Sequence, residues 1–263
     1  MKILKRIAIA FSMYSRIPMP IFEWEDDDYK KAIAFLPLVG LVIGLIEILV
    51  MVCGGFLEVS RIVMVPLLAV VPIIVTGGFH LDGYMDVNDA LSSYQGPEKS
   101  LEIMKDPHIG AFAVIGLARY GLIYLAALLA LPLYYMDDMD MWAIKFFAAC
   151  FVIVRAMCGI TCLQMKKAKK DGMLNNETRD SGKGTLAILY GFLVAGVVYT
   201  VVIRPVAGIV CIAAVLLYTW YYGRLCDKRF GGVTGDTAGF YVCQGELVYL
   251  IVMVLCEYAY ILL

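Results

Sequence analysis

The chain has 263 residues, of which 62% are hydrophobic and only 17% are charged. This composition is typical of a polytopic membrane protein, and a net charge of −1 argues against a nucleic-acid partner. The 8 cysteines are scattered through apolar stretches and form no metal-binding pairs. We therefore predict an all-α helical bundle embedded in a lipid bilayer as one domain over residues 1–263.

The N-terminal segment, residues 1–30, begins with Lys2, Lys5 and Arg6 and continues into a short apolar run. A cleaved signal peptide is excluded because the run is stopped by Arg16 and the break at 18–20, and no small-residue cleavage site follows. This pattern predicts an amphipathic helix that lies at the membrane interface.

Hydropathy predicts about seven transmembrane helices, and Lys and Arg predict their orientation. The spans are expected at 32–52, 62–79, 110–135, 141–163, 185–203, 205–225 and 246–263. Most of the 22 Lys and Arg residues fall on the side of the N-terminus, which predicts a cytoplasmic N-terminus. The segments 80–109, 164–184 and 226–245 would then all emerge on the cytoplasmic face, where their polar motifs can meet.

The first of these motifs contains Asp82, Asp86 and Asp89, spaced i, i+4 and i+7. On a helix this spacing places the three carboxylates on one face, where they repel one another unless a cation lies between them. Mg²⁺ fits because it binds carboxylate oxygens and leaves positions for phosphates. The alternative is a solvated loop whose acids cap helices. His80 could serve as a base, a substrate contact or an interfacial histidine.

A short helix of about ten residues is predicted between Pro97 and Pro107. It would end at Lys105 and Asp106, at the mouth of the third span. Asp106 could complete the shell of the cation and Lys105 could meet a phosphate. Taken alone, this segment is an ordinary surface helix.

The third motif, residues 231–239, combines four glycines with Thr234, Asp236 and Thr237. Such a loop could form a backbone nest for phosphate, with Asp236 near a cation or a ribose hydroxyl. A plain turn before the last span is the alternative.

Two arginines, Arg119 and Arg155, lie deep within predicted spans. A charge at that depth costs about 3 kcal/mol, so each should face the bundle interior or a wet cavity. The fork of Arg155 fits phosphate oxygens, and an interhelical ion pair is the alternative. Carboxylates, a cation, basic side chains and a glycine-rich loop together favour phosphoryl or nucleotidyl transfer, without naming the substrates.

These motifs resemble those of the cobalamin synthase family (adenosylcobinamide-GDP ribazoletransferase). The resemblance extends over nearly the whole chain and is specific in residues 76–83 with Asp86 and Asp89, in 101–106, and in 231–237 with Glu246. Residues 14–20 and 35–40 also agree with it.

The resemblance implies a Mg²⁺-dependent enzyme of the cell (inner) membrane whose active site lies on the cytoplasmic face. Adenosylcobinamide-GDP and α-ribazole, or its 5′-phosphate, would give adenosylcobalamin, or its 5′-phosphate, and GMP. Whether the protein forms a homo-oligomer is left open. The implied roles are metal binding by Asp82, Asp86, Asp89 and Asp106, catalysis by His80, Asp82, Asp86 and Lys105, and substrate binding by Arg155, Gly235, Asp236 and Thr237.

Two other functions fit parts of the sequence. A CDP-alcohol phosphotransferase has a similar spaced aspartate motif, but the Ala-Arg that normally follows its Asp-Gly is missing after Gly83. A cation-coupled secondary transporter would place its acids in mid-bilayer on interrupted helices, whereas these aspartates are predicted at the membrane face.

Overall fold

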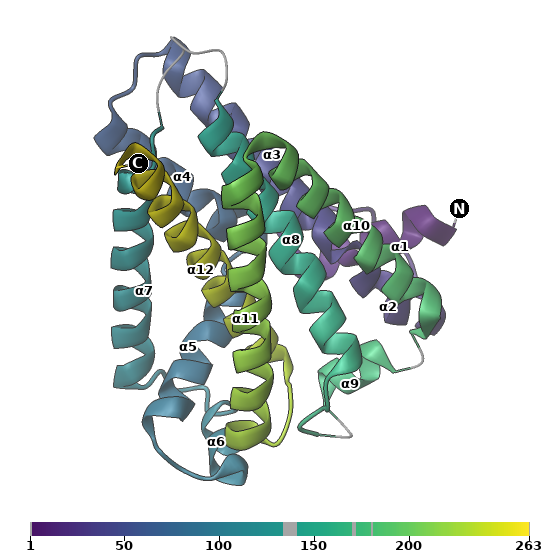
Figure 1. The fold of residues 1–263 in the computed structure, drawn as a ribbon. Helices are drawn as coiled ribbons and strands as arrows, with labels where there is room; N and C mark the ends of the chain where they lie inside the picture. Colours follow the sequence, from purple (N-terminus) through teal and green to yellow (C-terminus); the bar gives the residue numbers. More distant parts are fainter. Residues whose placement is uncertain (1, 134–140, 170–171, 180, 263) are drawn as a thin grey trace.

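A computed structural model describes residues 2–133, 141–169, 172–179 and 181–262. Within these ranges the protein is helical (Figure 1). In chain order the helices are α1 (Lys2–Tyr14), α2 (Asp26–Lys31), η1 (Ala32–Phe35), α3 (Leu36–Phe56), α4 (Arg61–Thr76), α5 (Phe79–Ser92), α6 (Pro97–Ile103), α7 (Ala111–Ala130), α8 (Trp142–Gln164), α9 (Met173–Thr178), α10 (Gly182–Ile203), α11 (Pro205–Phe230) and α12 (Gly235–Leu262).

Six helical stretches in the described part of the chain are long and apolar enough to cross a membrane. They are Asp26–Phe56, which joins α2, η1 and α3, and the helices α7, α8, α10, α11 and α12. The helices α4 and α5 pass the same test only as a pair that is bent by 95°. The prediction of a polytopic helical bundle is thus confirmed, with six spans in the described part of the chain, or seven if the bent pair of α4 and α5 counts as one.

The bend between α4 and α5 comes from Gly77 and Gly78. Both have positive φ angles, 67° and 80°, which lie in the left-handed region that glycine enters without steric cost. The predicted span 62–79 was therefore too long, because α4 ends at Thr76 and the chain turns sharply before α5 begins.

Other boundaries also differ from the sequence prediction. The helix α12 begins at Gly235 rather than 246, so the predicted loop 226–245 is reduced to the few residues between α11 and α12. The third span was predicted to run to 135, but α7 ends at Ala130. The segment 80–109 contains α5, which carries the three aspartates, and α6, which is the short helix predicted after Pro97.

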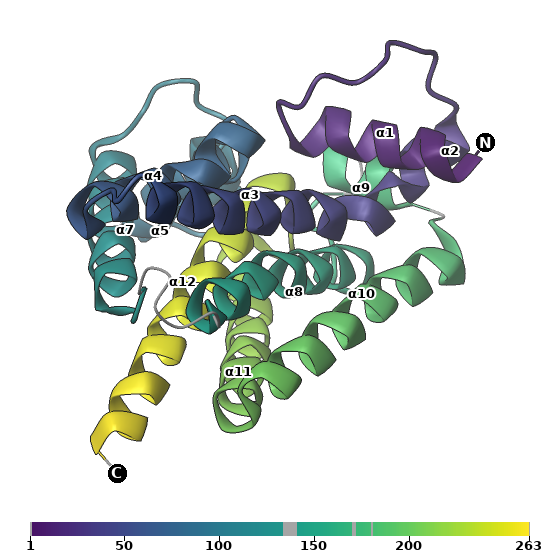
Figure 2. The same cartoon turned by 90° about the horizontal axis from the view of Figure 1, so that it is seen from above.

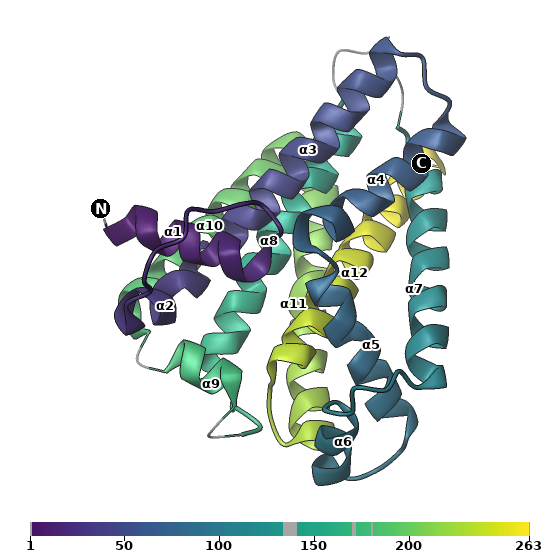
Figure 3. The same ribbon diagram turned by 180° about the vertical axis from the view of Figure 1, so that it is seen from behind.

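The core of the bundle is α8, which lies between α3 and α10 (Figure 2) and also packs against α12. Apolar residues on all sides of α8 are buried, as expected for a helix that is hydrophobic all round. Viewed from behind, α5 is flanked by α7 and α12 (Figure 3).

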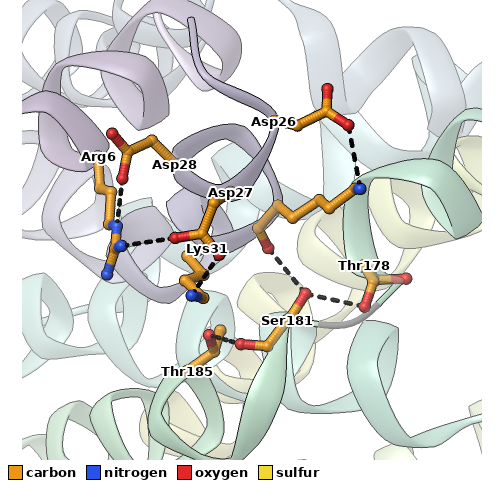
Figure 4. Close-up of polar contacts among 9 residues, drawn as sticks. Arg6, Asp26, Asp27, Asp28, Lys31, Thr178, Ser181 and Thr185 are labelled. Atoms are coloured by element: carbon orange, nitrogen blue, oxygen red, sulfur yellow. Dashed lines mark hydrogen bonds and ion pairs between the residues drawn. The ribbon is translucent and has the colours of Figure 1, made fainter. Parts of the chain in front are cut away.

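The N-terminal segment folds as α1 and α2, which are tied together by ion pairs. The Arg6 guanidinium donates to Asp28 at 2.7 Å and to Asp27 at 3.0 Å (Figure 4). The Ser181 hydroxyl donates to the Lys30 carbonyl at 2.7 Å, which fixes α2 to the start of α10. Ile9, Ala10, Phe11 and Tyr14, in the second half of α1, are buried, while Ile3 and Leu4 near its start are exposed.

Candidate active site

The helix α5 presents the three spaced aspartates, and its contact with α12 adds a fourth. Glycines make this contact close: a Cβ at Gly83 would lie 2.7 Å from the Asp236 carbonyl oxygen, and one at Gly239 would lie 2.8 Å from that of His80. Small residues allow membrane helices to approach this closely. As a result, Asp236, in the first turn of α12, lies beside the aspartate face of α5.

The four carboxylates interact unfavourably with one another. Asp86, which is half-buried, experiences the repulsion of Asp82, Asp236 and Asp89. The same repulsion acts between Asp236 and Asp82, and it is opposed by attraction to Lys169. Acidic groups that are held together in this way create a site of negative potential that favours a cation.

A pocket of about 270 Å³ opens next to these acids, and three lysines line it. We call it the lysine–aspartate pocket. Its polar wall comes from the ends of five elements: α5, α6, the α8–α9 connection, α9 and the start of α12. The charged residues in that wall are Asp82, Lys105, Lys167, Lys169, Glu177 and Asp236, and Gly235 also lines it.

Two of the lysines, Lys105 and Lys169, repel each other as the aspartates do. Interaction with Lys105 lowers the pKa of Lys169, and burial lowers the pKa of Lys167. A group of ammonium ions beside a group of carboxylates can accept an anion and a cation at the same time. A metal–diphosphate complex has that combination of charges.

A short backbone pairing brings two of these lysines to the site. Lys167 and Val233 form an isolated parallel bridge, in which the Val233 amide donates to the Lys166 carbonyl at 2.8 Å and the Ala168 amide donates to the Val233 carbonyl at 3.1 Å. Sequence reasoning missed Lys167 and Lys169 as site residues. Both residues belong to a cluster of lysines at 166–170, and this cluster could have indicated an anion site. In the sequence analysis it supported only the orientation of the spans.

The predicted glycine-rich nest at 231–239 is in large part the capped start of α12. The Thr234 amide donates to the Thr237 hydroxyl oxygen at 2.8 Å, and the Thr237 amide donates to the Thr234 hydroxyl oxygen at 3.1 Å. These reciprocal bonds satisfy amides of the first helical turn. Thr237 is fully buried and also accepts from the Tyr222 hydroxyl at 3.1 Å, so its side chain is used in the fold, while Gly235 and Asp236 face the pocket.

Asp106 is not among the residues that line the lysine–aspartate pocket. Its side chain is exposed and accepts two hydrogen bonds from His108, one from the backbone amide at 2.9 Å and one at Nδ1 at 2.7 Å. These bonds lower the pKa of Asp106. The contacts of Asp106 are thus with His108, and its role as a metal ligand stays a prediction.

His80 and Arg155 face a second cavity, also of about 270 Å³, which we call the apolar cavity. Arg155 donates to the Glu246 carboxylate at 2.5 Å, and both side chains are buried. The interhelical ion pair was the alternative reading of Arg155, and it is the one that the structure contains. Arg119, by contrast, is exposed in the structure, so the prediction that it faces the bundle interior was wrong; its guanidinium donates to Asn88 on α5 at 3.2 Å.

The carboxylate oxygens of the aspartates are ligands that suit Mg²⁺, but a substrate would have to supply further oxygen ligands. Among the described residues, no three acidic, histidine or cysteine side chains are already close enough to hold one metal ion. Mg²⁺ is commonly bound by one or two carboxylates with waters and substrate phosphates, rather than by a complete protein cage. Asp82 and Asp236, which both line the lysine–aspartate pocket, are carboxylates of the kind that such an arrangement uses.

Fold and site thus define a polytopic helical membrane protein with an acidic and basic pocket at one end of its bundle. Comparison with known proteins gives the family. The family model described as cobalamin-5-phosphate synthase matches residues 6–254, and the chain belongs to this family.

Relatives in several bacteria are named adenosylcobinamide-GDP ribazoletransferase. The protein of Lachnoclostridium phytofermentans is 38% identical over 98% of this chain and 96% of its own length. That of Listeria welshimeri is 32% identical over 96% and 98%, and that of Clostridium perfringens strain SM101 is 31% identical over 90% and 92%. No solved structure matches the chain. The family match favours the enzyme over the transporter and phospholipid alternatives.

Proposed function

We propose that the protein catalyses the Mg²⁺-dependent transfer of the adenosylcobinamide phosphoryl group from adenosylcobinamide-GDP to α-ribazole or its 5′-phosphate, with release of GMP. The observation that supports this proposal is the lysine–aspartate pocket, in which repelling carboxylates stand beside repelling ammonium groups. The names of the relatives support the choice of substrates.

In this proposal Asp82 and Asp236 hold Mg²⁺ together with the substrate phosphates, and Asp86 and Asp89 add negative charge on the same face of α5. When bound, Mg²⁺ neutralises diphosphate oxygens and stabilises the charge on the departing GMP. Lys105, Lys167 and Lys169 bind the remaining phosphate oxygens. This assignment moves the diphosphate contact from Arg155 to the lysines, because the Arg155 guanidinium is already paired with Glu246.

The reaction is a single displacement at phosphorus. A ribose hydroxyl oxygen of the acceptor forms a bond to the phosphorus nearest the corrinoid, while the bond from that phosphorus to the bridging oxygen breaks. GMP leaves with the bridging oxygen and its electron pair. The hydroxyl proton passes to a pocket aspartate, for which Asp82 is the best placed, because His80 faces the other cavity.

The pocket is proposed to face the cytoplasm of the cell in which this inner-membrane protein resides. The excess of Lys and Arg on the same side as the N-terminus supports this orientation. It also gives both reactants access to the site from the cytoplasm.

The direct test is an assay of GMP release by the purified protein in nanodiscs, with both acceptor forms, with and without EDTA. We expect GMP only when corrinoid, acceptor and Mg²⁺ are all present, and restored release when Mg²⁺ is added back after chelation. Release of GMP that persists at full rate in EDTA would contradict the role of the metal. Transfer to diacylglycerol-type acceptors, with no transfer to ribazole, would contradict the choice of substrates.

A further inference from the structure

A third space lies over the N-terminal half of α8, where this helix is flanked by α3 and α10 (Figure 2). Its volume is about 430 Å³, and we call it the α8 groove. Residues with small side chains from all three helices form its buried floor, namely Gly44, Ala148, Ala149 and Gly196. None of its lining residues lines the lysine–aspartate pocket or the apolar cavity, so the groove is separate from the site described above.

The rims of the α8 groove face the bilayer. Leu41 and Leu45 of α3 and Tyr199 of α10 line the groove and are 44%, 56% and 44% exposed. All three helices belong to stretches that are long and apolar enough to cross a membrane. Apolar side chains that stay exposed on such helices contact lipid tails, which are as apolar as leucine itself. The groove is therefore open to an acyl chain or to an apolar helix of another protein.

One end of the groove carries a positive charge at the level of the lipid headgroups. Lys145, in the first turn of α8, is the only charged residue among the described residues that line the groove. Trp142, at the start of the same turn, lies under the Arg204 guanidinium at 4.1 Å, and the ring of Tyr260 is 5.5 Å from that guanidinium. Tryptophan and tyrosine concentrate at membrane–water interfaces, so this cluster marks the interface. The Lys145 ammonium therefore lies within reach of lipid phosphates.

The charge also argues against a second copy of the chain as the occupant. In a symmetric dimer the same patch would lie on both sides of the contact. Lys145 would then approach its own counterpart, and no acidic residue among the described ones lines the groove to separate the two ammonium ions. Like charges in surroundings of low dielectric constant repel strongly. An anionic phospholipid, by contrast, brings an acyl chain for the floor and a phosphate for the lysine.

We propose that the α8 groove is a binding site for one anionic phospholipid, with the lipid phosphate at Lys145 and the upper part of one acyl chain along the floor. The groove follows α8 from Lys145 to Val152, which is about 10 Å of helix. One leaflet of hydrocarbon is about 15 Å thick, so the end of the chain leaves the groove into the bilayer. The site lies at the opposite end of α8 from Lys167, so the lipid is held away from the lysine–aspartate pocket and has a structural role.

The test uses two probes with the same acyl chains, a phosphatidylglycerol and a phosphatidylcholine, each with a photoreactive diazirine in the upper part of one chain. The full-length protein is placed in phosphatidylcholine nanodiscs that contain a small fraction of one probe. After illumination, mass spectrometry of peptides measures labelling at 41–48, 145–152 and 192–199. We expect phosphatidylglycerol to label these segments about fivefold more than phosphatidylcholine, the effect of one lysine beside a net negative headgroup.

Variants of the lysine test the headgroup contact. Lys145→Gln should abolish the preference for phosphatidylglycerol, and Lys145→Arg should keep it, because the positive charge is retained. Lys183, at an exposed position on α10 outside the groove, provides the matched control, and Lys183→Gln should label as the unaltered protein does.

A groove-filling variant tests the acyl-chain contact. Ala195 lines the groove and is exposed, so the ring in Ala195→Phe extends over the floor without displacing a buried side chain. Ala187, exposed on the same helix but outside the groove, gives the matched control Ala187→Phe. We expect Ala195→Phe to lower the labelling of α3 and α8 by both probes about tenfold, the effect of excluding a few buried methylene groups. Ala187→Phe should leave the labelling unchanged.

Three results would overturn the proposal. Equal labelling of the groove by the two probes would show an unselective contact with bulk lipid, and a preference that survives Lys145→Gln would place the headgroup elsewhere. Absence of labelling, together with a dimer in size-exclusion chromatography that Ala195→Phe dissociates, would show that a second copy fills the groove. GMP release enters none of these measurements, so the inference is tested independently of the proposed function.

Discussion

Two spaces of the same size, about 270 Å³ each, lie on the two sides of α5 and differ in almost everything else. The lysine–aspartate pocket has charges of both signs that repel within each group. In the apolar cavity, by contrast, Arg155 and Glu246 form a closed pair. The helix α5 therefore lines both a charged pocket and a largely apolar cavity. The comparison shows that the role of an ionisable residue in this protein can be inferred only when the residue it pairs with is known.

The largest expected effect is on turnover, from loss of the acids in the lysine–aspartate pocket. Asp82→Asn and Asp86→Asn should each lower kcat about 1,000-fold or more, because removal of a metal-binding charge costs several kcal/mol in the transition state. GMP release is measured, and monodispersity in size-exclusion chromatography confirms folding. Asp227→Asn, at an exposed position on α11, is the matched control and should be close to unaltered. Normal rates in both pocket variants would remove the basis for the metal site.

The next effect concerns stability and tests the closed pair of the apolar cavity. Arg155→Met should destabilise the protein by about 3 kcal/mol or more, because it leaves the buried Glu246 carboxylate without its partner. The double variant Arg155→Met with Glu246→Leu should recover most of that loss, since no charge is then left unpaired. Thermal unfolding in nanodiscs measures both.

The same double variant separates two roles of Arg155. If Arg155 acts only through Glu246, the KM for adenosylcobinamide-GDP should change little once stability is restored. A stable double variant that has lost the ability to bind the corrinoid nucleotide would show that Arg155 contacts the diphosphate, as the sequence first suggested.

A smaller effect is expected on substrate affinity from the lysines. Lys169→Met should raise the KM for adenosylcobinamide-GDP about tenfold, the effect of one lost charge-assisted hydrogen bond. The salt dependence of KM should also become weaker in this variant. Lys228→Met, at an exposed position on α11, serves as the control. Equal KM changes in the two variants would mean that Lys169 acts only through the overall surface charge.

The smallest effect is a pH dependence of stability that originates in Glu177. Burial raises the pKa of this carboxyl to about 7, and it lies in the wall of the lysine–aspartate pocket. The folded state therefore holds its proton more tightly than the unfolded state, so stability is highest below the unfolded pKa and is lost as pH rises toward 7. Thermal unfolding between pH 5 and pH 8 should show a loss on the order of 1–2 kcal/mol. Glu177→Gln should flatten this dependence; a slope that persists in the variant would assign it to another group.

Local patterns predicted much of the fold. Proline at the start of α6 and the turn at Met104 agree with the short helix expected after Pro97. The i, i+4, i+7 spacing of the aspartates predicted a shared helix face, and α5 is helical across all three. The prediction failed where a loop and a capped helix have similar composition, as at α12, because glycines that serve close packing look like glycines that serve a turn.

The sequence did not predict which of the membrane-spanning helices are buried in the bundle. The helices α8 and α10 are both apolar enough to span a membrane, yet 89% of the central stretch of α8 is buried and only 17% of that of α10. In a bilayer, lipid and protein interior accept the same apolar side chains, so composition does not distinguish a central helix from a peripheral one.

The sequence by itself determined that this is a helical membrane protein, that its acids share one helix face, and which family it resembles, because these depend on composition and on spacings within a few residues. Only the tertiary structure decided which charges meet. Glu246 reaches Arg155 from 91 residues away, and Lys167 reaches the acids through its pairing with Val233. Coulomb interactions depend on distance in space, and the distance between residues that are far apart in the chain is set by how the helices pack.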